Sequence, residues 1–286
     1  MKKISLLLVA VACFYACSSV PITGRQQLML VSDSEVLTLS LQSYNEYMQT
    51  AVKSTDKTKT ALVEKVGRKI ADAVESYYQA SGMESLLQDY SWEFNLVQDE
   101  AVNAFCMPGG KIVVYTGILP YTQDEAGLAV VLGHEVAHAV AKHSNERMSQ
   151  QMVAEYGAAG LSALLGKASS TVQTIGQTVY GLGAEYGVML PFNRKQELEA
   201  DHLGLIFMAI AGYNPEVAVS FWQRMAQQGS GTPEFMSTHP SDATRISDIQ
   251  RQLPEALEVY NTIWGSGAKP ATTTAPKAGT SNQWKF

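Results

Sequence analysis

The chain has 286 residues, of which 46% are hydrophobic, and its formal charge is −6. This length and composition are typical of one globular domain with a sizeable core, and the sequence contains no repeat period. An acidic chain without a lysine or arginine cluster is unsuited to neutralising phosphates, so we exclude nucleic acid as a partner.

The first residues have the pattern of a secretory signal. Two lysines precede an apolar run over residues 4–16, and this run is too short for a transmembrane helix. Cys17 follows, as in a bacterial lipoprotein that is cleaved before the cysteine and lipidated on it. Cys13 competes because Ala10-Val11-Ala12 precedes it, but a polar, turn-forming segment begins at Ser18, which favours Cys17. Cleavage by an ordinary signal peptidase is the alternative.

The rest of the chain divides into one long domain and a tail. We place the signal at residues 1–16, the domain at 17–264, and a disordered tail at 265–286, where Gly, Pro, Ala, Thr and Ser predominate.

Hydrophobic periodicity predicts helices and strands in the first half of the domain. Helices are expected over 33–49 and 59–81, and strands over 92–97 and 111–116. The second strand is rich in β-branched residues and is preceded by Gly109-Gly110. If its edge is exposed, it could pair with an extended peptide through main-chain hydrogen bonds; a core strand without substrate contact is the alternative.

Residues 126–141 have the small and aliphatic side chains of a buried helix, and Thr122-Gln123-Asp124-Glu125 before them is a capping-box pattern. This helix contains His134-Glu135-Val136-Ala137-His138. Residues four apart share a helix face, so both histidines can bind one ion with Glu135 beside it, as in HExxH metalloproteases. Buried imidazoles need partners for their ring nitrogens, which favours a cation over two ordinary core histidines.

A catalytic zinc site commonly has three protein ligands and leaves a fourth position for water. We expect the third ligand from a later helix with Asn193 as its cap. Glu197 and Asp201 share a face of this helix. We assign Glu197 to the metal and Asp201 to the second N–H of His134, because metal-bound histidines usually donate that proton to a carboxylate or carbonyl. Glu199 points away from this face, which predicts a solvated or salt-bridged residue.

Three further residues that could bind a metal are not expected to do so. His143 and His202 lie in helical stretches beside charged residues, which predicts surface or supporting positions. Cys106 lies beside Phe105 and Met107 and is interpreted as a small buried hydrophobe. With Cys13 and Cys17 in the signal and lipid site, no intrachain disulfide is expected.

Residues 157–190 connect the two helices of the site. They are rich in Gly, Ala, Ser and Thr, and their apolar runs are too brief to span a bilayer. Our hypothesis is a lid or a membrane-surface hairpin over the cleft, with a packed helical hairpin as the alternative.

A combination of motifs resembles the M48 metallopeptidases, above all the bacterial lipoprotein and mitochondrial quality-control branch. The similarity runs from Pro21-Ile22-Thr23-Gly24-Arg25 to Ile246. It is carried by His134 to His138, Glu197 with Asp201, Asn103-Ala104-Phe105 with Pro108-Gly109-Gly110, and Thr238-His239-Pro240.

What the resemblance implies is an α+β, mainly helical zincin domain of the gluzincin type, with a small β-sheet and an HExxH active-site helix. Glu197 would be the third ligand of one Zn²⁺ per chain, and Glu135 the catalytic base. His239 would either stabilise the reaction intermediate or occupy the fourth zinc position and keep the enzyme latent. Arg245 is either a second donor to the intermediate or a plain salt bridge near the site.

The resemblance also favours peptide binding at a strand edge near the metal. The residues that we assign to substrate binding are Asn103, Ala104, Phe105, Ile112 and Val113.

The sequence therefore predicts a lipid-anchored zinc endopeptidase of the bacterial cell envelope that faces the periplasm, with the outer membrane favoured over the inner. Zinc lowers the pKa of its bound water to about 7, and Glu135 would accept the proton. The expected partners are unfolded or misassembled envelope proteins and, through the lipid, the membrane. Two alternatives remain open: a zinc-stabilised chaperone-like or binding protein with little or no proteolysis, and a freely secreted peptidase.

Overall fold

The computed structural model describes residues 17–20, 23–164, 193–227, 235–236, 239 and 244–265, apart from the side chains of residues 17 and 154–164. The expected signal over 1–16 therefore lies outside the described residues. The same holds for 165–190 of the expected lid or hairpin and for 266–286 of the expected tail.

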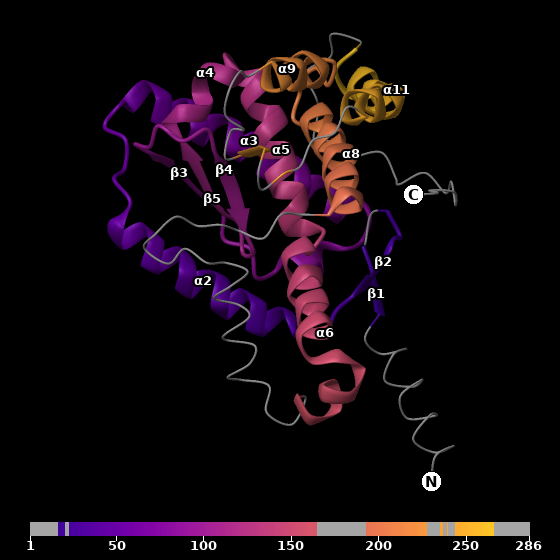
Figure 1. Ribbon diagram of the computed structural model, residues 1–286. Coiled ribbons are helices and arrows are strands. Elements are labelled where there is room, and N and C mark those ends of the chain that lie inside the picture. The colour runs from indigo at the N-terminus through magenta and orange to yellow at the C-terminus, as the bar shows by residue number, and fades with distance from the viewer. Residues whose placement is uncertain are drawn as a thin grey trace.

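A three-stranded mixed sheet lies at one side of the molecule (Figure 1). Strand β5 (Lys111–Tyr115) occupies the middle, with β3 (Glu93–Val97) parallel to it and β4 (Ala104–Met107) antiparallel to it. The two strands predicted from the sequence are confirmed as β3 and β5. The central place of β5 contradicts its expected exposed edge, because both edges of its backbone already pair with neighbouring strands.

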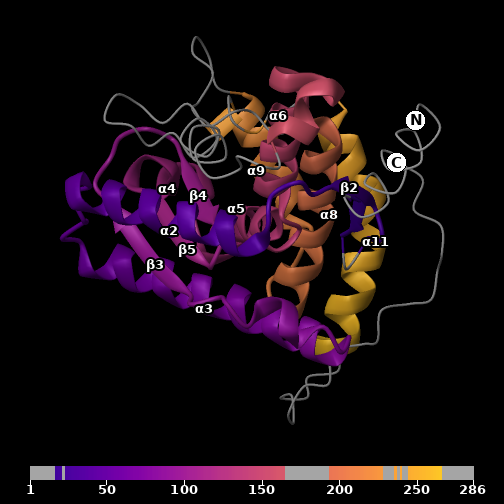
Figure 2. The ribbon, with the colours of Figure 1, turned by 90° about the horizontal axis from the view of Figure 1, so that it is seen from below.

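Helices cover both faces of the sheet. Helix α2 (Asp33–Thr50) packs over the face that carries Phe105, Val113 and Tyr115. Helix α3 (Lys57–Ala80) packs on the opposite face, and in Figure 2 strand β3 is seen between these two helices. Both helices agree with the predicted ranges to within two residues at each end.

The main core forms where the sheet meets a group of helices that carry the functional residues. Helix α5 (Glu125–Val140) packs on β4, α3 and α8 (Arg194–Ile210), and α8 packs in turn on α11 (Arg245–Trp264). Figure 1 shows α5 and α8 side by side through the centre of the molecule. Helices α9 (Val217–Ala226) and α4 (Leu119–Thr122) close one end of this group. The predicted mainly helical α+β fold is confirmed.

Two facing glycines allow the contact between α5 and α8. A Cβ on Gly133 would lie 2.9 Å from the carbonyl oxygen of Gly204, and a Cβ on Gly204 would lie 2.9 Å from the backbone nitrogen of His134. Real Cβ atoms are not found so close to backbone, so these positions need glycine for the two backbones to touch. The close approach brings the histidines of α5 beside the acids of α8.

The N-terminal segment forms a small hairpin beside α6 (His143–Leu164). Its strands are β1 (Cys17–Ser19) and β2 (Gln26–Leu28), which pair antiparallel. Two short 3₁₀ turns complete the described elements, η1 (Glu84–Leu87) and η2 (Thr116–Ile118). None of the helices in the described part of the chain has the length and hydrophobicity required to cross a bilayer.

Candidate metal centre

Helix α5 brings two histidines into the core. Asp124 caps this helix through its side chain, which accepts a hydrogen bond from the backbone N–H of Gly127. The sequence suggested Thr122 for this role, but Thr122 ends the preceding helix, so the cap lies two residues later. His134 and His138 lie one turn apart, and their Nε2 atoms are 3.1 Å from each other.

Helix α8 supplies two acids on the face that meets α5. Asn193 caps it with a capping box that includes Gln196, as the sequence predicts. Glu197 and Asp201 follow at a separation of one turn and are both buried. Glu197 reaches the histidine pair, with its two carboxylate oxygens 3.4 Å from Nε2 of His134 and 3.4 Å from Nε2 of His138.

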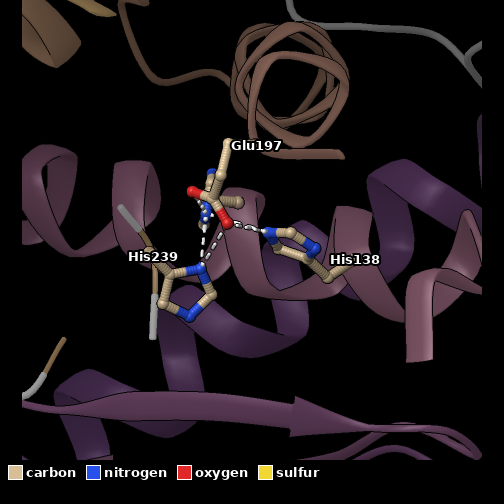
Figure 3. A group of neighbouring side chains, drawn as sticks. His138, Glu197 and His239 are labelled. Carbon is tan, nitrogen blue, oxygen red and sulfur yellow. Dashed lines mark hydrogen bonds and ion pairs between the residues drawn. The ribbon is translucent and has the colours of Figure 1, made fainter. Parts of the chain in front are cut away.

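His239 completes a group of four ligand atoms. Its Nδ1 lies 3.1 Å from Nε2 of His134 and 3.1 Å from Oε1 of Glu197. Figure 3 shows His138 and His239 directed at the carboxylate of Glu197. The ligand atoms of the four residues all lie within 4.8 Å of one another.

The spacing of these atoms fits a four-coordinate ion. In a tetrahedron with ligands about 2.0 to 2.1 Å from a zinc ion, neighbouring ligand atoms are about 3.3 to 3.4 Å apart. The contacts given above are 3.1 to 3.4 Å. Three histidine nitrogens and a carboxylate that point at one place carry lone pairs that repel one another unless a proton or a cation lies between them. The donor set therefore fits a bound metal.

The pKa shifts describe a group that is close to its metal-binding protonation state. Burial holds the pKa of His138 well below its ordinary value, so its ring is neutral near pH 7. Burial alone would raise the pKa of Glu197, but neighbouring His239 and the hydrogen bonds from His134 and His138 hold it well below its ordinary value. Metal ligands must be deprotonated, and both of these groups meet that requirement.

His134 differs because it has acidic partners on both sides of its ring. Burial lowers its pKa, but the hydrogen bonds and charges of Asp201 and Glu197 prevail and raise that pKa to about 9. Without a metal, His134 therefore holds a proton near pH 7, and a metal that binds there must displace this proton.

Asp201 lies behind His134 as expected from the sequence. Its Oδ1 is 2.9 Å from Nδ1 of His134. Arg245 donates two hydrogen bonds to the same carboxylate, from Nε to Oδ2 at 2.8 Å and from Nη2 to Oδ1 at 2.7 Å. Its Nη1 donates a third hydrogen bond to Glu197 at 3.0 Å. The guanidinium also stacks on Trp222. These contacts make Arg245 a support for two acids, so of its two expected roles the salt bridge fits the geometry better.

Glu135 lies next to the four ligands. Its carboxylate accepts a hydrogen bond from the backbone N–H of Cys106, while its buried Oε1 has no hydrogen-bond partner among the described residues. Nε2 of His239 lies 3.3 Å from this oxygen but lacks hydrogen-bond geometry. Burial raises the pKa of Glu135, and the charge of Glu197 adds to that effect. A buried oxygen of this kind fits a water molecule or substrate proton as its missing partner.

Three supporting residues are buried in the structure. His143 has the supporting position of its two expected ones: it is fully buried, with its Nδ1 2.8 Å from Nδ1 of His138. Glu199 is salt-bridged, the second of its two expected forms, and lies buried in an ion pair with Arg25, 2.7 Å away. His202 is also buried and pairs with Glu255 of α11. Helix-face arguments could not find the partners of Glu199, because those partners come from the start of the chain.

The residues expected to bind substrate lie on two strands that differ in access. Ile112 and Val113 are fully buried in the central strand β5, so neither lies at the exposed strand edge that their assignment to substrate binding requires. Ala104 and Phe105 belong to β4, which is an edge strand among the described residues, and Asn103 precedes it. Cys106 of the same strand is buried, and burial raises the pKa of its thiol well above the ordinary value.

Two helix-borne histidines four residues apart, a glutamate from the next helix of the core and a neighbouring buried glutamate define a zincin-type metallopeptidase centre. Comparison with known proteins agrees with this class. Residues 60–253 match the model of peptidase family M48, and the chain belongs to this family.

Several relatives are named as metalloendopeptidases or proteases. The chain is 38% identical over 188 residues to the mitochondrial metalloendopeptidase OMA1 of Schizosaccharomyces pombe, with 62% of this chain and 53% of the relative aligned. For OMA1 of Saccharomyces cerevisiae the identity is 31% over 273 residues, 91% of this chain and 76% of the relative. A beta-barrel assembly-enhancing protease of Yersinia pestis is 33% identical over 167 residues, 56% of this chain and 34% of the relative.

These comparisons correct one prediction and limit another. The match with human OMA1 covers 84% of this chain but only 46% of the human protein, so this chain spans about half the length of several relatives. The prediction of a bacterial envelope location, with the outer membrane favoured over the inner, is wrong, because the relatives that match most of the chain are mitochondrial. The short apolar run after two lysines, which was interpreted as a secretory signal, does not by itself specify a compartment.

Proposed function

We propose that this chain is a zinc-dependent endopeptidase with His134, His138 and Glu197 as the metal ligands and Glu135 as the general base. The observation that carries the proposal is the buried Oε1 of Glu135, which has no hydrogen-bond partner in the described part of the chain, beside four converging ligand atoms. A purely structural metal site, as in the chaperone-like alternative, requires no base at this position.

The chemistry follows from the side chains. Zinc, when bound there, acts as a Lewis acid and lowers the pKa of a water ligand to about 7. Glu135 accepts the proton of the attacking water on Oε1 and delivers it to the departing amine nitrogen. Its raised pKa suits both steps, because a base must hold the proton and release it within one turnover. Asp201 keeps the proton of His134 on Nδ1, which leaves Nε2 free for the metal.

We further propose that substrates bind along the edge of β4. The backbone N–H of Tyr115 donates to the carbonyl of Asn103, so the main chain of Asn103 faces β5, and that of Ala104 and Cys106 faces away from it. The N–H of Cys106 reaches Glu135, so this edge borders the catalytic carboxylate. An extended polypeptide could add to it as a strand, a mode of binding that depends little on sequence. Unfolded or misassembled proteins are therefore the expected substrates.

His239 has a regulatory role in this proposal. A catalytic zinc site keeps one coordination position for water, and Nδ1 of His239 lies where the fourth ligand of the group belongs. This position supports a latent form of the enzyme, in which release of His239 opens the site. The alternative role of His239, stabilising the intermediate, would need its ring beside the substrate carbonyl instead.

Membrane attachment through a lipid on Cys17, with the signal at 1–16 and the peptidase domain at 17–264, also belongs to this proposal. It is supported by the apolar run of residues 4–16 that precedes Cys17. Replacing Cys17 with serine should move the protein from the membrane fraction to the soluble fraction. Unchanged membrane retention of Cys17→Ser would contradict lipidation at this residue.

Glu135→Gln tests the catalytic proposal. The zinc-loaded variant should keep its metal, because Glu135 is not a ligand, and its cleavage of an unfolded protein such as casein should fall about 100- to 10,000-fold. Glu125→Gln is the matched control, since Glu125 begins the same helix but bonds to Lys65 and Tyr213 away from the centre. Proteolysis that persists in Glu135→Gln would remove Glu135 from its role, and a metal-binding wild type without proteolysis would favour the chaperone-like alternative.

A further inference from the structure

A buried series of hydrogen-bonded polar groups connects the metal ligand His138 to residues near the start of the described polypeptide. Nδ1 of His138 lies 2.8 Å from Nδ1 of His143, and Nε2 of His143 lies 2.8 Å from Oε2 of Glu199. Glu199 is held in turn by the hydroxyl of Thr23 on one oxygen and by Nε of Arg25 on the other, 2.7 Å away. His143 and Glu199 are both completely buried.

When a metal is bound, the hydrogen bonds that join His138, His143 and Glu199 can have only one direction. A neutral imidazole has one N–H and one lone pair, so a bond from Nε2 of His138 to the metal places the proton on Nδ1. That proton must be donated to Nδ1 of His143, which leaves the proton of His143 on Nε2, facing Glu199. An ionised carboxylate only accepts hydrogen bonds. Glu199 therefore fixes the proton position of His143, and His143 fixes that of His138.

Arg25 binds Glu199, the acidic end of this series, and also joins two helices. Its Nη1 and Nη2 bond to the two oxygens of Glu146 at 2.9 and 2.8 Å, while its Nε bonds to Glu199. Glu146 belongs to α6 and Glu199 to α8, and Gln196 of α8 donates a further bond to Glu146 at 2.7 Å. The planar guanidinium suits this double contact, whereas a lysine could not bind both carboxylates with the same geometry.

We propose that Thr23 and Arg25 are positioning residues of the metal centre, which orient the ligand His138 through Glu199 and His143. We call this pair of residues the N-terminal clasp. Each Asp or Glu that orients a metal-bound histidine must itself be held in place. The residues that hold Glu199 come from the segment before β2, which lies outside the range that matches the family model. The clasp makes metal retention depend on the N-terminal segment being seated on α6 and α8.

This inference rests on the proposed metal site, and its test therefore measures metal retention in place of proteolysis. Thr23→Val removes the hydroxyl that donates to Glu199 at nearly constant volume, and Thr23→Ser keeps it. Arg25→Lys keeps the positive charge and removes the fork. Tyr44→Phe is a control for general loss of stability, because the Tyr44 hydroxyl on α2 bonds to Glu93 and Asn95 of β3, which do not belong to the series from His138 to Arg25.

The full chain of each variant is loaded with zinc, and the rate of zinc transfer to a competing chelator is measured together with the unfolding temperature. Residues that orient metal ligands typically change metal affinity by about 10- to 100-fold. Thr23→Val and Arg25→Lys should therefore lose zinc at least about tenfold faster, whereas Thr23→Ser and Tyr44→Phe should stay within about twofold of the wild type.

Two results would overturn the clasp. The first is zinc loss within about twofold of the wild type in folded Thr23→Val and Arg25→Lys. The second is equal acceleration in Tyr44→Phe, which would mean that zinc loss follows stability alone. If Arg25→Lys does not fold, the comparison of Thr23→Val with Thr23→Ser decides. A wild type that binds no zinc would refute the proposed metal centre itself, and Glu135→Gln, which keeps zinc but not proteolysis, separates the two proposals.

Discussion

Replacement of Asp201 by asparagine tests how the centre holds His134. The carboxylate receives three N–H groups: Nδ1–H of His134 at 2.9 Å and two from Arg245 at 2.7 and 2.8 Å. Asparagine has nearly the same shape but only one accepting oxygen, and its other terminal atom is a donor. Whichever way the amide turns, one of its N–H groups faces an N–H of His134 or Arg245.

The magnitude of the effect follows from this mismatch. Loss of a partner that orients a metal-bound histidine weakens metal binding about 10- to 100-fold, which is about 1.4 to 2.7 kcal/mol. The folded protein loses hydrogen bonds between charged groups as well, each worth about 1.5 to 3 kcal/mol when buried. Arg245 keeps its bond to Glu197, so the fold should survive while the metal is held less tightly.

Zinc affinity is measured by competition with a chelator of known affinity at pH 7.5, alongside the unfolding temperature without metal. Asp248→Asn is a suitable control, because Asp248 is a buried acid of α11 that pairs with Arg251 and does not belong to the group of four ligands. Zinc affinity of Asp201→Asn within about twofold of the wild type would refute the idea that Asp201 orients His134.

Three further predictions concern the same centre. The pKa of His134 is raised from its ordinary value of 6.5 to about 9. The metal-free protein therefore gains stability, at most about 3 kcal/mol, that is fully present below pH 6.5 and is lost between pH 6.5 and 9. A chelator-treated sample whose unfolding temperature does not decline over this range would contradict this prediction. Gly204→Ala should destabilise the protein by about 1 to 3 kcal/mol in denaturant unfolding and weaken zinc binding, since the new Cβ would press on the backbone of α5; unaltered stability would show that the helices can separate freely. His239→Ala should increase casein cleavage by the reciprocal of the open fraction, about tenfold if a tenth of the molecules are open, whereas a loss of cleavage would make His239 a donor to the intermediate.

The sequence allowed prediction of those features that depend on spacing along one helix. His134 and His138, or Glu197 and Asp201, share a face because they are four residues apart, and this holds in whatever surroundings the helix is placed. The cap at Asn193 is equally local. The cap at Thr122 was wrong for a related reason, because Asp124 competes with it and only the three-dimensional path of the chain decides which side chain reaches Gly127.

Features that depend on distant segments could not be predicted in the same way. The composition of residues 111–116 indicates a strand but not the number of its neighbours, and β5 proved to be central. The position of Glu199 on α8 predicts a solvated or salt-bridged residue, and the salt bridge is confirmed, but its partners Thr23 and Arg25 come from the start of the chain and could not be named. Contacts over more than 170 residues leave no local pattern.

The charges around the ligand group favour a divalent cation. Glu135, Glu197 and Asp201 are buried there, and Arg245 is the cation in contact with them in the described part of the chain. One guanidinium can balance one carboxylate, and burying an unbalanced charge costs several kcal/mol. Two negative charges thus remain to be balanced when the histidines are neutral, and a doubly charged ion supplies that balance. Without the ion, protonation of His134 and the raised pKa of Glu135 reduce the same excess, so proton uptake should accompany removal of the metal.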